Sequence, residues 1–186
     1  MPSLITHSLV GIAAGKTLSD RKMPLKFWGL SVLCSTLPDA DVIGFFLHVP
    51  YGHFFGHRGF FHSLFFGLLL SLLVMTLFFR EKRRFSASWW GYLAYFFLVT
   101  ASHGLLDALT NGGLGIALLS PFDSTRYFFP QAPIVVSPLG IKAFFSAWGL
   151  RVMMSEILWV WIPAFVLVML SRLIRFIYRR RDGRFS

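Results

Sequence analysis

The stretch "GFFHSLFFGLLLSLLVMTLFF", residues 59–79, decides the fold class of this chain. It holds 21 residues and no Lys, Arg, Asp or Glu. A helix of about 20 apolar residues crosses the roughly 30 Å hydrocarbon core of a bilayer. The stretch therefore predicts a membrane-spanning helix. His57, Arg58 and His62 stand at its entrance, where polar groups are costly and mark either an interface or a site.

The composition predicts that the rest of the chain also lies in a membrane. Of its 186 residues, 55% are hydrophobic and 14% are charged, and the mean hydropathy is +0.64. A soluble domain has about 25% charged residues. The length predicts a single integral membrane domain, residues 1–186.

Cys34 is the sole cysteine, which excludes an intrachain disulfide. The stretch "MPSLITHSLVG" lacks the features of a removable signal peptide.

The net charge of +10 raises the question of nucleic-acid binding, but the distribution of the charge argues against it. Most basic residues form three groups at the ends of apolar segments, a pattern that is typical of cytoplasmic loops in membrane proteins. The groups are Lys16, Arg21, Lys22 and Lys26; Arg80, Lys82, Arg83 and Arg84; and Arg172, Arg175, Arg179, Arg180, Arg181 and Arg184. We expect a topology signal and contact with anionic lipid, and no nucleic-acid partner.

The apolar pattern predicts an all-α, polytopic membrane bundle of about five membrane-embedded helices. They are residues 3–18, 24–37, 59–79, 88–109 and 156–178. Residues 110–139 read as a long extracytoplasmic loop, and residues 141–154 as an amphipathic helix at the membrane interface. If every basic group is cytoplasmic, the N-terminus lies outside and the C-terminus inside. At about 1.5 Å per helical residue, the histidines and several aspartates then gather in or near the outer half of the bilayer.

Two short motifs have the spacing of metal ligands. In "HGLLD", His103 and Asp107 are four residues apart and share one face of a helix, where they can grip a divalent metal or form a hydrogen bond. In "PDAD", Asp39 and Asp41 follow a helix end. They can serve one cation, or one can ligate while the other orients a histidine. The alternative for this pair is a solvated loop.

The remaining polar side chains have less specific signals. In "HRGFFHS", the two histidines can face one centre or decorate an interface, and the fork of Arg58 matches a phosphate or a carboxylate. His7 is either a ligand or a packed core residue. In "SPFDSTRYFFP", Arg126 can receive a substrate phosphate, and Asp123 is an extra ligand or a turn cap.

Taken together, these residues predict a metal site. The expected core ligands are His7, Asp39, His62, His103 and Asp107, with Asp41 and His57 as base, ligand or orienting groups. Nitrogen and oxygen ligands without a thiolate suit Zn²⁺ first, with Mn²⁺ or Fe²⁺ as alternatives. The number of ligands allows one or two ions, and a two-metal site suits phosphoryl displacement.

The motifs "MPSLITHSLVG", "LPDAD", "HRGFFHS", "HGLLDALTNGG" and "LLSPFDSTRYFFP" resemble, in this order and over nearly the whole chain, the YdjM-like family. This resemblance implies a bacterial inner-membrane protein, in part LexA-regulated, whose metal-dependent hydrolase activity is itself inferred. The chain is more distantly similar to the zinc-dependent phospholipase C and P1 nuclease group. It lacks that group's H-x-x-x-E motif, so a trinuclear zinc site is not expected.

The sequence thus favours a metal-dependent hydrolase of a phosphoester in a lipid or lipid-linked substrate. Metal-activated water would be the nucleophile, and Arg58 and Arg126 would neutralise the anionic group of the substrate. Two alternatives remain open: an ion or proton transporter with a His/Asp relay, and a non-enzymatic protein stabilised by metal. The sequence leaves the oligomeric state unassigned.

Overall fold

The computed structural model describes residues 1–19 and 22–181, so Arg21 and Arg184 lie outside the described residues. The described chain is helical, with two isolated β-bridges in its long loop. Its elements are α1 (Leu4–Leu18), α2 (Leu25–Thr36), the 3-10 helix η1 (Leu37–Val42), α3 (Ile43–Phe46), the 3-10 helix η2 (Phe60–His62), α4 (Leu64–Phe78), α5 (Ala87–Ala108), α6 (Ile141–Phe144), α7 (Ala147–Glu156), the π-helix η3 (Ile157–Trp161) and α8 (Ile162–Arg181).

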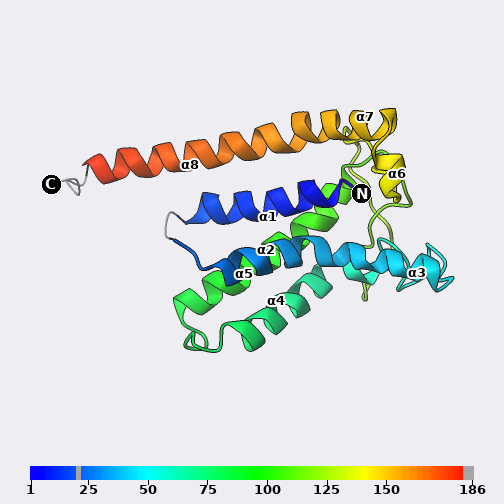
Figure 1. Ribbon diagram of the computed structural model, residues 1–186. Coiled ribbons are helices and arrows are strands. Elements are labelled where there is room, and N and C mark those ends of the chain that lie inside the picture. Colours follow the sequence, from blue (N-terminus) through cyan, green and yellow to red (C-terminus); the bar gives the residue numbers. More distant parts are fainter. Residues whose placement is uncertain (20–21, 182–186) are drawn as a thin grey trace.

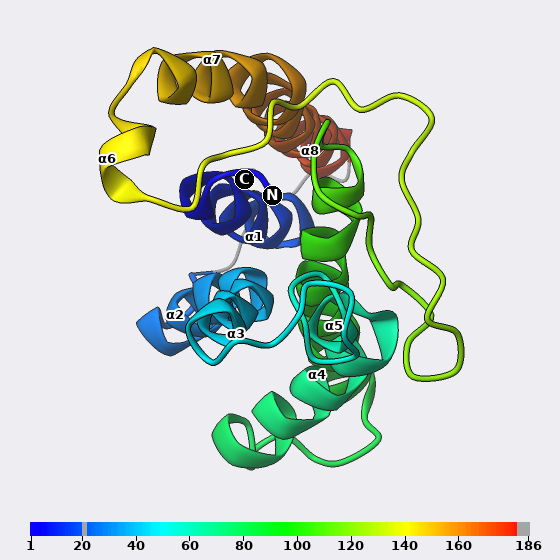
Figure 2. The same cartoon turned by 90° about the vertical axis from the view of Figure 1, so that its right-hand side faces the viewer.

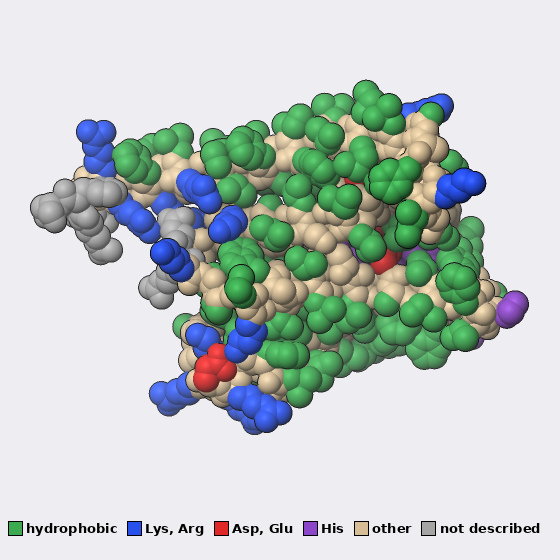
Figure 3. Space-filling model, viewed as in Figure 1, with side chains coloured by type: hydrophobic (Ala, Val, Ile, Leu, Met, Phe, Trp, Pro, Cys, Tyr) green, Lys and Arg blue, Asp and Glu red, His purple; other side chains and the backbone are tan. Residues whose placement is uncertain are grey.

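The long helices form a bundle whose two ends differ in chemistry. α1, α2, α4 and α5 lie side by side, and α8 runs along α1 (Figure 1). At one end Phe27, Phe79, Trp89 and Phe96 belong to a buried apolar cluster. At the other end, the loops, α3 and α6 gather around the start of α1 (Figure 2). Most Lys and Arg side chains visible in Figure 3 lie at the end where α8 finishes.

Close packing of α1 against α2 depends on two glycines. A Cβ atom at Gly11 would lie 3.0 Å from the Ser31 carbonyl oxygen, and one at Gly15 would lie 2.7 Å from the Trp28 ring. Tyr95 of α5 reaches the same contact, because its hydroxyl donates to the Gly11 carbonyl at 2.9 Å. These two glycines, four residues apart in α1, therefore allow the helices to pack closely.

Within residues 1–19 and 22–181, two helices are long and apolar enough to cross a membrane, which is fewer than the five predicted. They are 25–46, made of α2, η1 and α3, and 147–181, made of α7, η3 and α8. Only 11% of the most apolar stretch of the second is buried, whereas the core helix of a soluble protein would be mostly buried. α1 and α4 are apolar but have 15 residues each, or about 22 Å of helix, which is less than the hydrocarbon core.

Serine caps explain where the helices begin. The hydroxyl of Ser63 accepts from the Phe66 N–H at 3.0 Å, so α4 begins at Leu64 and not at residue 59 as predicted. His62 consequently lies in η2, before the helix and not in its first turn. Ser3 caps α1 in the same way, because its hydroxyl accepts from the Thr6 N–H at 3.3 Å.

The predicted interfacial helix at residues 141–154 is not a separate element. α6 ends at Phe144, and α7 begins at Ala147 and continues through η3 into α8. The π-helical turn lies just before Pro163, whose ring and missing N–H disfavour a regular α-helix at that point. The continuous helix joins the site end of the bundle to its basic end (Figure 1).

Candidate metal centre

Five polar side chains from separate elements converge at the loop end of the bundle. α1 contributes one, η1 and η2 one each, and α5 two; they are His7, Asp39, His62, His103 and Asp107. Each is at most 5% exposed. These are the five residues that the sequence predicted as core ligands, and the structure places them together. A group made of Asp39, His62, His103 and Asp107 has one ligand atom from each residue within 4.8 Å of all the others.

The spacing of these atoms fits a single ion. The Nε2 atoms of His62 and His103 are 3.1 Å apart. Asp39 Oδ1 lies 3.3 Å from His103 Nε2 and 3.6 Å from His62 Nε2, and Asp107 Oδ2 lies 3.5 Å from His62 Nε2. Zinc with bonds of roughly 2.0–2.1 Å separates its tetrahedral ligands by about 3.3 Å. The measured separations are therefore those of ligand atoms around one ion.

His7 closes the cluster from the side of α1. Its Nε2 lies 3.3 Å from Asp107 Oδ1 and 4.0 Å from Asp39 Oδ2. Its ring stacks on that of His103, with centroids 3.8 Å apart and planes 18° from parallel. His7 can thus act as a fifth ligand, or hold the His103 ring in place.

The cluster contains buried polar atoms that no hydrogen bond satisfies. They include both nitrogens of His7 and all four carboxylate oxygens of Asp39 and Asp107. Leaving one buried polar group unpaired costs about 1–3 kcal/mol, and more if the group is charged. Such groups are normally paired or coordinate a metal. The residues present therefore fit a divalent cation.

Two histidines have an acceptor oxygen next to Nδ1, on the side of the ring that faces away from the cluster. His103 Nδ1 lies 2.7 Å from the Ser35 carbonyl oxygen, which can only accept. His62 Nδ1 lies 3.1 Å from Asp41 Oδ2. If both Nδ1 atoms are the donors, the two Nε2 lone pairs face each other and need a cation between them. Metal-binding histidines commonly have this second contact to a carbonyl or carboxylate.

Asp41 has a different role from Asp39. Its Oδ1 lies 2.6 Å from His57 Nδ1, and its Oδ2 accepts from the Arg58 backbone N–H at 3.0 Å. Asp41, His57 and His62 also form a group with the spacing of metal ligands. Its hydrogen bonds place Asp41 where it can orient His57, and its Oδ2 also lies next to His62 Nδ1.

Comparison with known proteins places the chain in a family. Residues 1–181 match the YdjM inner membrane protein family. The chain belongs to this family. It is 37% identical to the inner membrane protein YbcI of Escherichia coli (strain K12) over 168 aligned residues. The aligned region covers 90% of this chain and 95% of the relative. No solved structure matches the chain significantly. The resemblance expected from the sequence motifs is thereby confirmed.

In this YdjM-family protein, Arg58 lies against the cluster and is almost completely buried. Its Nε is 3.3 Å from Asp107 Oδ2, and its other nitrogens donate to the Gly112 carbonyl at 2.6 Å and to the Thr110 hydroxyl at 2.9 Å. Its φ of 64° is rare for a residue with a side chain, a strain that costs about 1–3 kcal/mol. These contacts use most of the guanidinium within the protein.

Arg126 supports the backbone next to the site instead of joining the cluster. It donates to the carbonyl oxygens of His57 at 3.1 Å and Tyr51 at 3.0 Å. Burial lowers the pKa of Arg126 and raises that of the Tyr51 phenol. Asp123 lies apart and accepts from the Thr125 N–H at 2.8 Å, and its hydrogen bonds to Thr125 lower the pKa of its carboxyl group. It therefore caps a turn in this structure.

Two residues that shape the site, Gly104 and Glu156, were not predicted from the sequence. A Cβ atom at Gly104 would lie 2.7 Å from the His62 carbonyl oxygen, so only glycine lets η2 approach α5 this closely. Glu156 is fully buried and accepts from the hydroxyls of Ser3 and Thr6, both at 2.6 Å. An acid inside a long apolar segment is itself a signal of a role, and it could have identified Glu156.

Proposed function

We propose that this protein is a membrane-bound hydrolase that uses one divalent metal, Zn²⁺ before Mn²⁺ or Fe²⁺, to cleave a phosphoester in a lipid or lipid-linked substrate. The observation that carries the proposal is the set of buried nitrogen and oxygen atoms of His7, Asp39 and Asp107 that have no hydrogen-bond partner. A divalent ion held there would supply a Lewis acid and an activated water. Three imidazoles and two carboxylates, without a thiolate, suit the three metals named.

The His57–Asp41 pair provides proton transfer in this proposal. Asp41 fixes His57 through Nδ1, so the Nε2 atom of the ring remains to exchange a proton with substrate. His57 and Arg58 line a cavity of about 380 Å³, together with Tyr51 and Trp148. A phosphate in this cavity would face the positive charge of Arg58, which already balances Asp107.

We further propose that the cluster faces the extracytoplasmic side of the bacterial inner membrane and that the C-terminus is cytoplasmic. The family match to inner membrane proteins supports the location. The concentration of Lys and Arg at the opposite end of the bundle supports the orientation (Figure 3). The proposed multi-pass topology keeps α1, α4 and α5 within the membrane beside the two long helices.

Metal analysis combined with an activity panel tests the hydrolase. We expect purified protein to hold about one Zn²⁺ per chain and to hydrolyse a phospholipid or a phosphodiester. His103→Ala should lose both metal and turnover, whereas His53→Ala, which alters an exposed histidine, should retain them. A protein without bound metal after reconstitution with Zn²⁺ would rule the proposal out.

Two other results would replace the hydrolase by one of the alternative functions. Metal-bound protein without turnover on the panel would identify a metal-stabilised membrane protein. A proton or metal flux in proteoliposomes that Asp107→Asn abolishes would identify a transporter. The cluster of mainly hydrophobic buried residues at the basic end, which includes Phe27, Phe79 and Phe96, favours a one-sided site.

A further inference from the structure

Two cavities meet beside the cluster, and they differ in lining. The polar cavity of about 380 Å³ contains Tyr51, His57 and Arg58. The second, here called the apolar groove, has about 630 Å³, within the range of ligand pockets. Three parts of the chain form its walls: the start of the chain, the end of α2 with the start of η1, and the segment that runs through α6. The lining residues are Met1–Ile5, Leu33, Thr36, Leu37, Asp39, Ala40, Val42, 137–141, Phe144 and Phe145. Met1 and residues 137–139 border both cavities.

We propose that the apolar groove binds one acyl chain of an anionic phospholipid and places the phosphoester of that lipid at Asp39. The inference rests on the proposed function for the identity of the reaction, but the binding of the chain can be measured without it. It identifies Ile5, Leu33 and Ile141 as residues that select the lipid.

The polar groups in the groove point to this orientation of the lipid. The Ser3 hydroxyl donates to Glu156 at 2.6 Å, and the Thr36 hydroxyl donates to the Val32 carbonyl at 2.8 Å. Both are therefore used within the protein. Asp39 has the only charged side chain among the described residues that line the groove, and neither of its oxygens has a hydrogen-bond partner. A lipid in the groove would thus meet hydrocarbon walls along its chain and the metal cluster at one end.

Exposure of the walls indicates that the groove opens to the bilayer. Ile5 is 51% exposed, Ile141 81% and Phe145 83%. In water this apolar surface would cost about 25 cal/mol per Å², whereas lipid chains match it. Figure 3 shows acidic and histidine side-chain atoms in a hollow that apolar side chains surround. Lys142 on α6 adds an exposed positive charge next to the wall, which complements an anionic headgroup.

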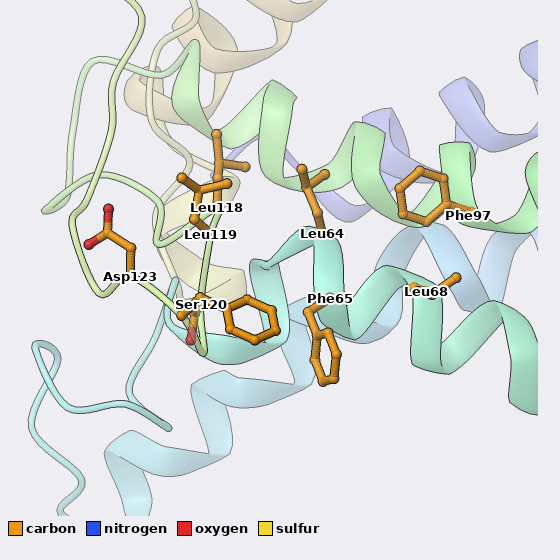
Figure 4. Close-up of a pocket in the computed structure, with 9 residues that line it drawn as sticks. Leu64, Phe65, Leu68, Phe97, Leu118, Leu119, Ser120 and Asp123 are labelled. Carbon is orange, nitrogen blue, oxygen red and sulfur yellow. The ribbon is translucent and has the colours of Figure 1, made fainter.

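A second apolar pocket on the protein provides a matched control. It has about 460 Å³ and lies between α4, α5 and the long loop (Figure 4). Leu64, Leu68 and Phe97 line it, but none of the five cluster residues does. Its one acid, Asp123, already accepts hydrogen bonds from Thr125 and Tyr127. This pocket therefore has apolar walls but no contact with the cluster residues.

Photo-cross-linking tests the groove independently of catalysis. Full-length, zinc-loaded protein would be placed in nanodiscs with phosphatidylglycerol that carries a diazirine in one acyl chain, and labelled peptides would be mapped by mass spectrometry. We expect labelling at Ile5, Leu33 and residues 141–145 to exceed labelling of the lipid-facing surface of α8 several-fold. Ile5→Trp should fill the groove and remove the excess, whereas Leu68→Trp in the second pocket should not.

The outcomes separate the groove from the hydrolase. Labelling no stronger than on α8, labelling concentrated in the second pocket, or an excess that survives both Ile5→Trp and Ile141→Trp would overturn the groove. Ile141→Trp lies on α6, outside the elements that hold the cluster, and therefore tests the groove even if Ile5→Trp fails to fold. Groove labelling without turnover would uphold the groove and contradict the hydrolase. Turnover on phosphatidylglycerol that neither Trp variant lowers would uphold the hydrolase and contradict the groove.

Discussion

Asp41 and the metal cluster contact opposite nitrogens of His62. Nδ1 lies 3.1 Å from Asp41 Oδ2, while Nε2 lies 3.1 Å from His103 Nε2. A carboxylate beside one ring nitrogen favours the tautomer with its proton there and makes the other nitrogen a better ligand. Asp41 would therefore act on a bound metal through His62.

Replacing Asp41 by Asn should weaken metal binding without abolishing it. The amide keeps the shape of the carboxylate but loses its charge, so we expect metal affinity to fall by about 10–100-fold. Asp39→Asn should weaken it further, because Asp39 supplies an oxygen to the site. Competition with a chelator measures both, and Asp123→Asn, a turn acid, is the control. Equal effects of the Asp39 and Asp41 variants would contradict the division of roles.

Gly104→Ala should damage the site although alanine is the better helix former. In an exposed helix this change stabilises by about 1 kcal/mol. Here the new methyl group would lie 2.7 Å from the His62 carbonyl oxygen, so we expect η2 to shift and the metal content to drop. Gly91→Ala in the same helix has nothing within 4 Å and should leave metal binding unchanged. Full metal occupancy in Gly104→Ala would show that η2 can move without affecting the cluster.

The sequence could predict the members of the cluster but not the geometry that separates their roles. His103 and Asp107 were predictable as a pair because residues four apart share one face of a helix. The sequence favours Asp39 over Asp41 as a ligand, but the irregular segment expected there gives no geometric reason for that choice. The two aspartates lie in the 3-10 helix η1, where three residues make a turn, so positions two apart point in different directions. One reaches the cluster and the other reaches His57.

The span count was less predictable for a related reason. Hydropathy alone extends the third apolar segment back to residue 59, but the Ser63 cap starts α4 five residues later. In the last segment, nothing in the pattern separates an interfacial helix from a continuous one. The difference depends on contacts between residues about 150 positions apart in the chain. Glu156 accepts hydrogen bonds from Ser3 and Thr6 at the start of α1.

Glu156→Gln should destabilise the fold while leaving the cluster ligands in place. One carboxylate oxygen accepts from both the Ser3 and Thr6 hydroxyls, and Trp161 donates to the same Thr6 hydroxyl at 2.7 Å. The other carboxylate oxygen accepts from the Ser3 backbone N–H at 2.5 Å. An amide cannot accept on both of its atoms, so we expect a loss of about 1–3 kcal/mol in the free energy of unfolding.

Glu81→Gln is the matched control for this change. Glu81 is exposed, and its pairing with Lys26 at 3.5 Å is a surface contact. We expect its substitution to alter stability by less than about 1 kcal/mol. Denaturation in detergent micelles compares the two variants, and equal stability of both would show that Glu156 does not anchor α1 to α7 and α8.

The proposed orientation predicts which loops an impermeant reagent can reach in cells. Cys34 is fully buried, so the unmodified protein should not react with a membrane-impermeant maleimide. Ser124→Cys in the exposed long loop should react from outside, whereas Ser88→Cys at the start of α5 should react only after the membrane is permeabilised. Both must react in detergent for the comparison to hold. The reverse pattern would place the cluster on the cytoplasmic side and would contradict an extracytoplasmic substrate. It would not affect the candidate metal centre, which depends only on distances within the chain.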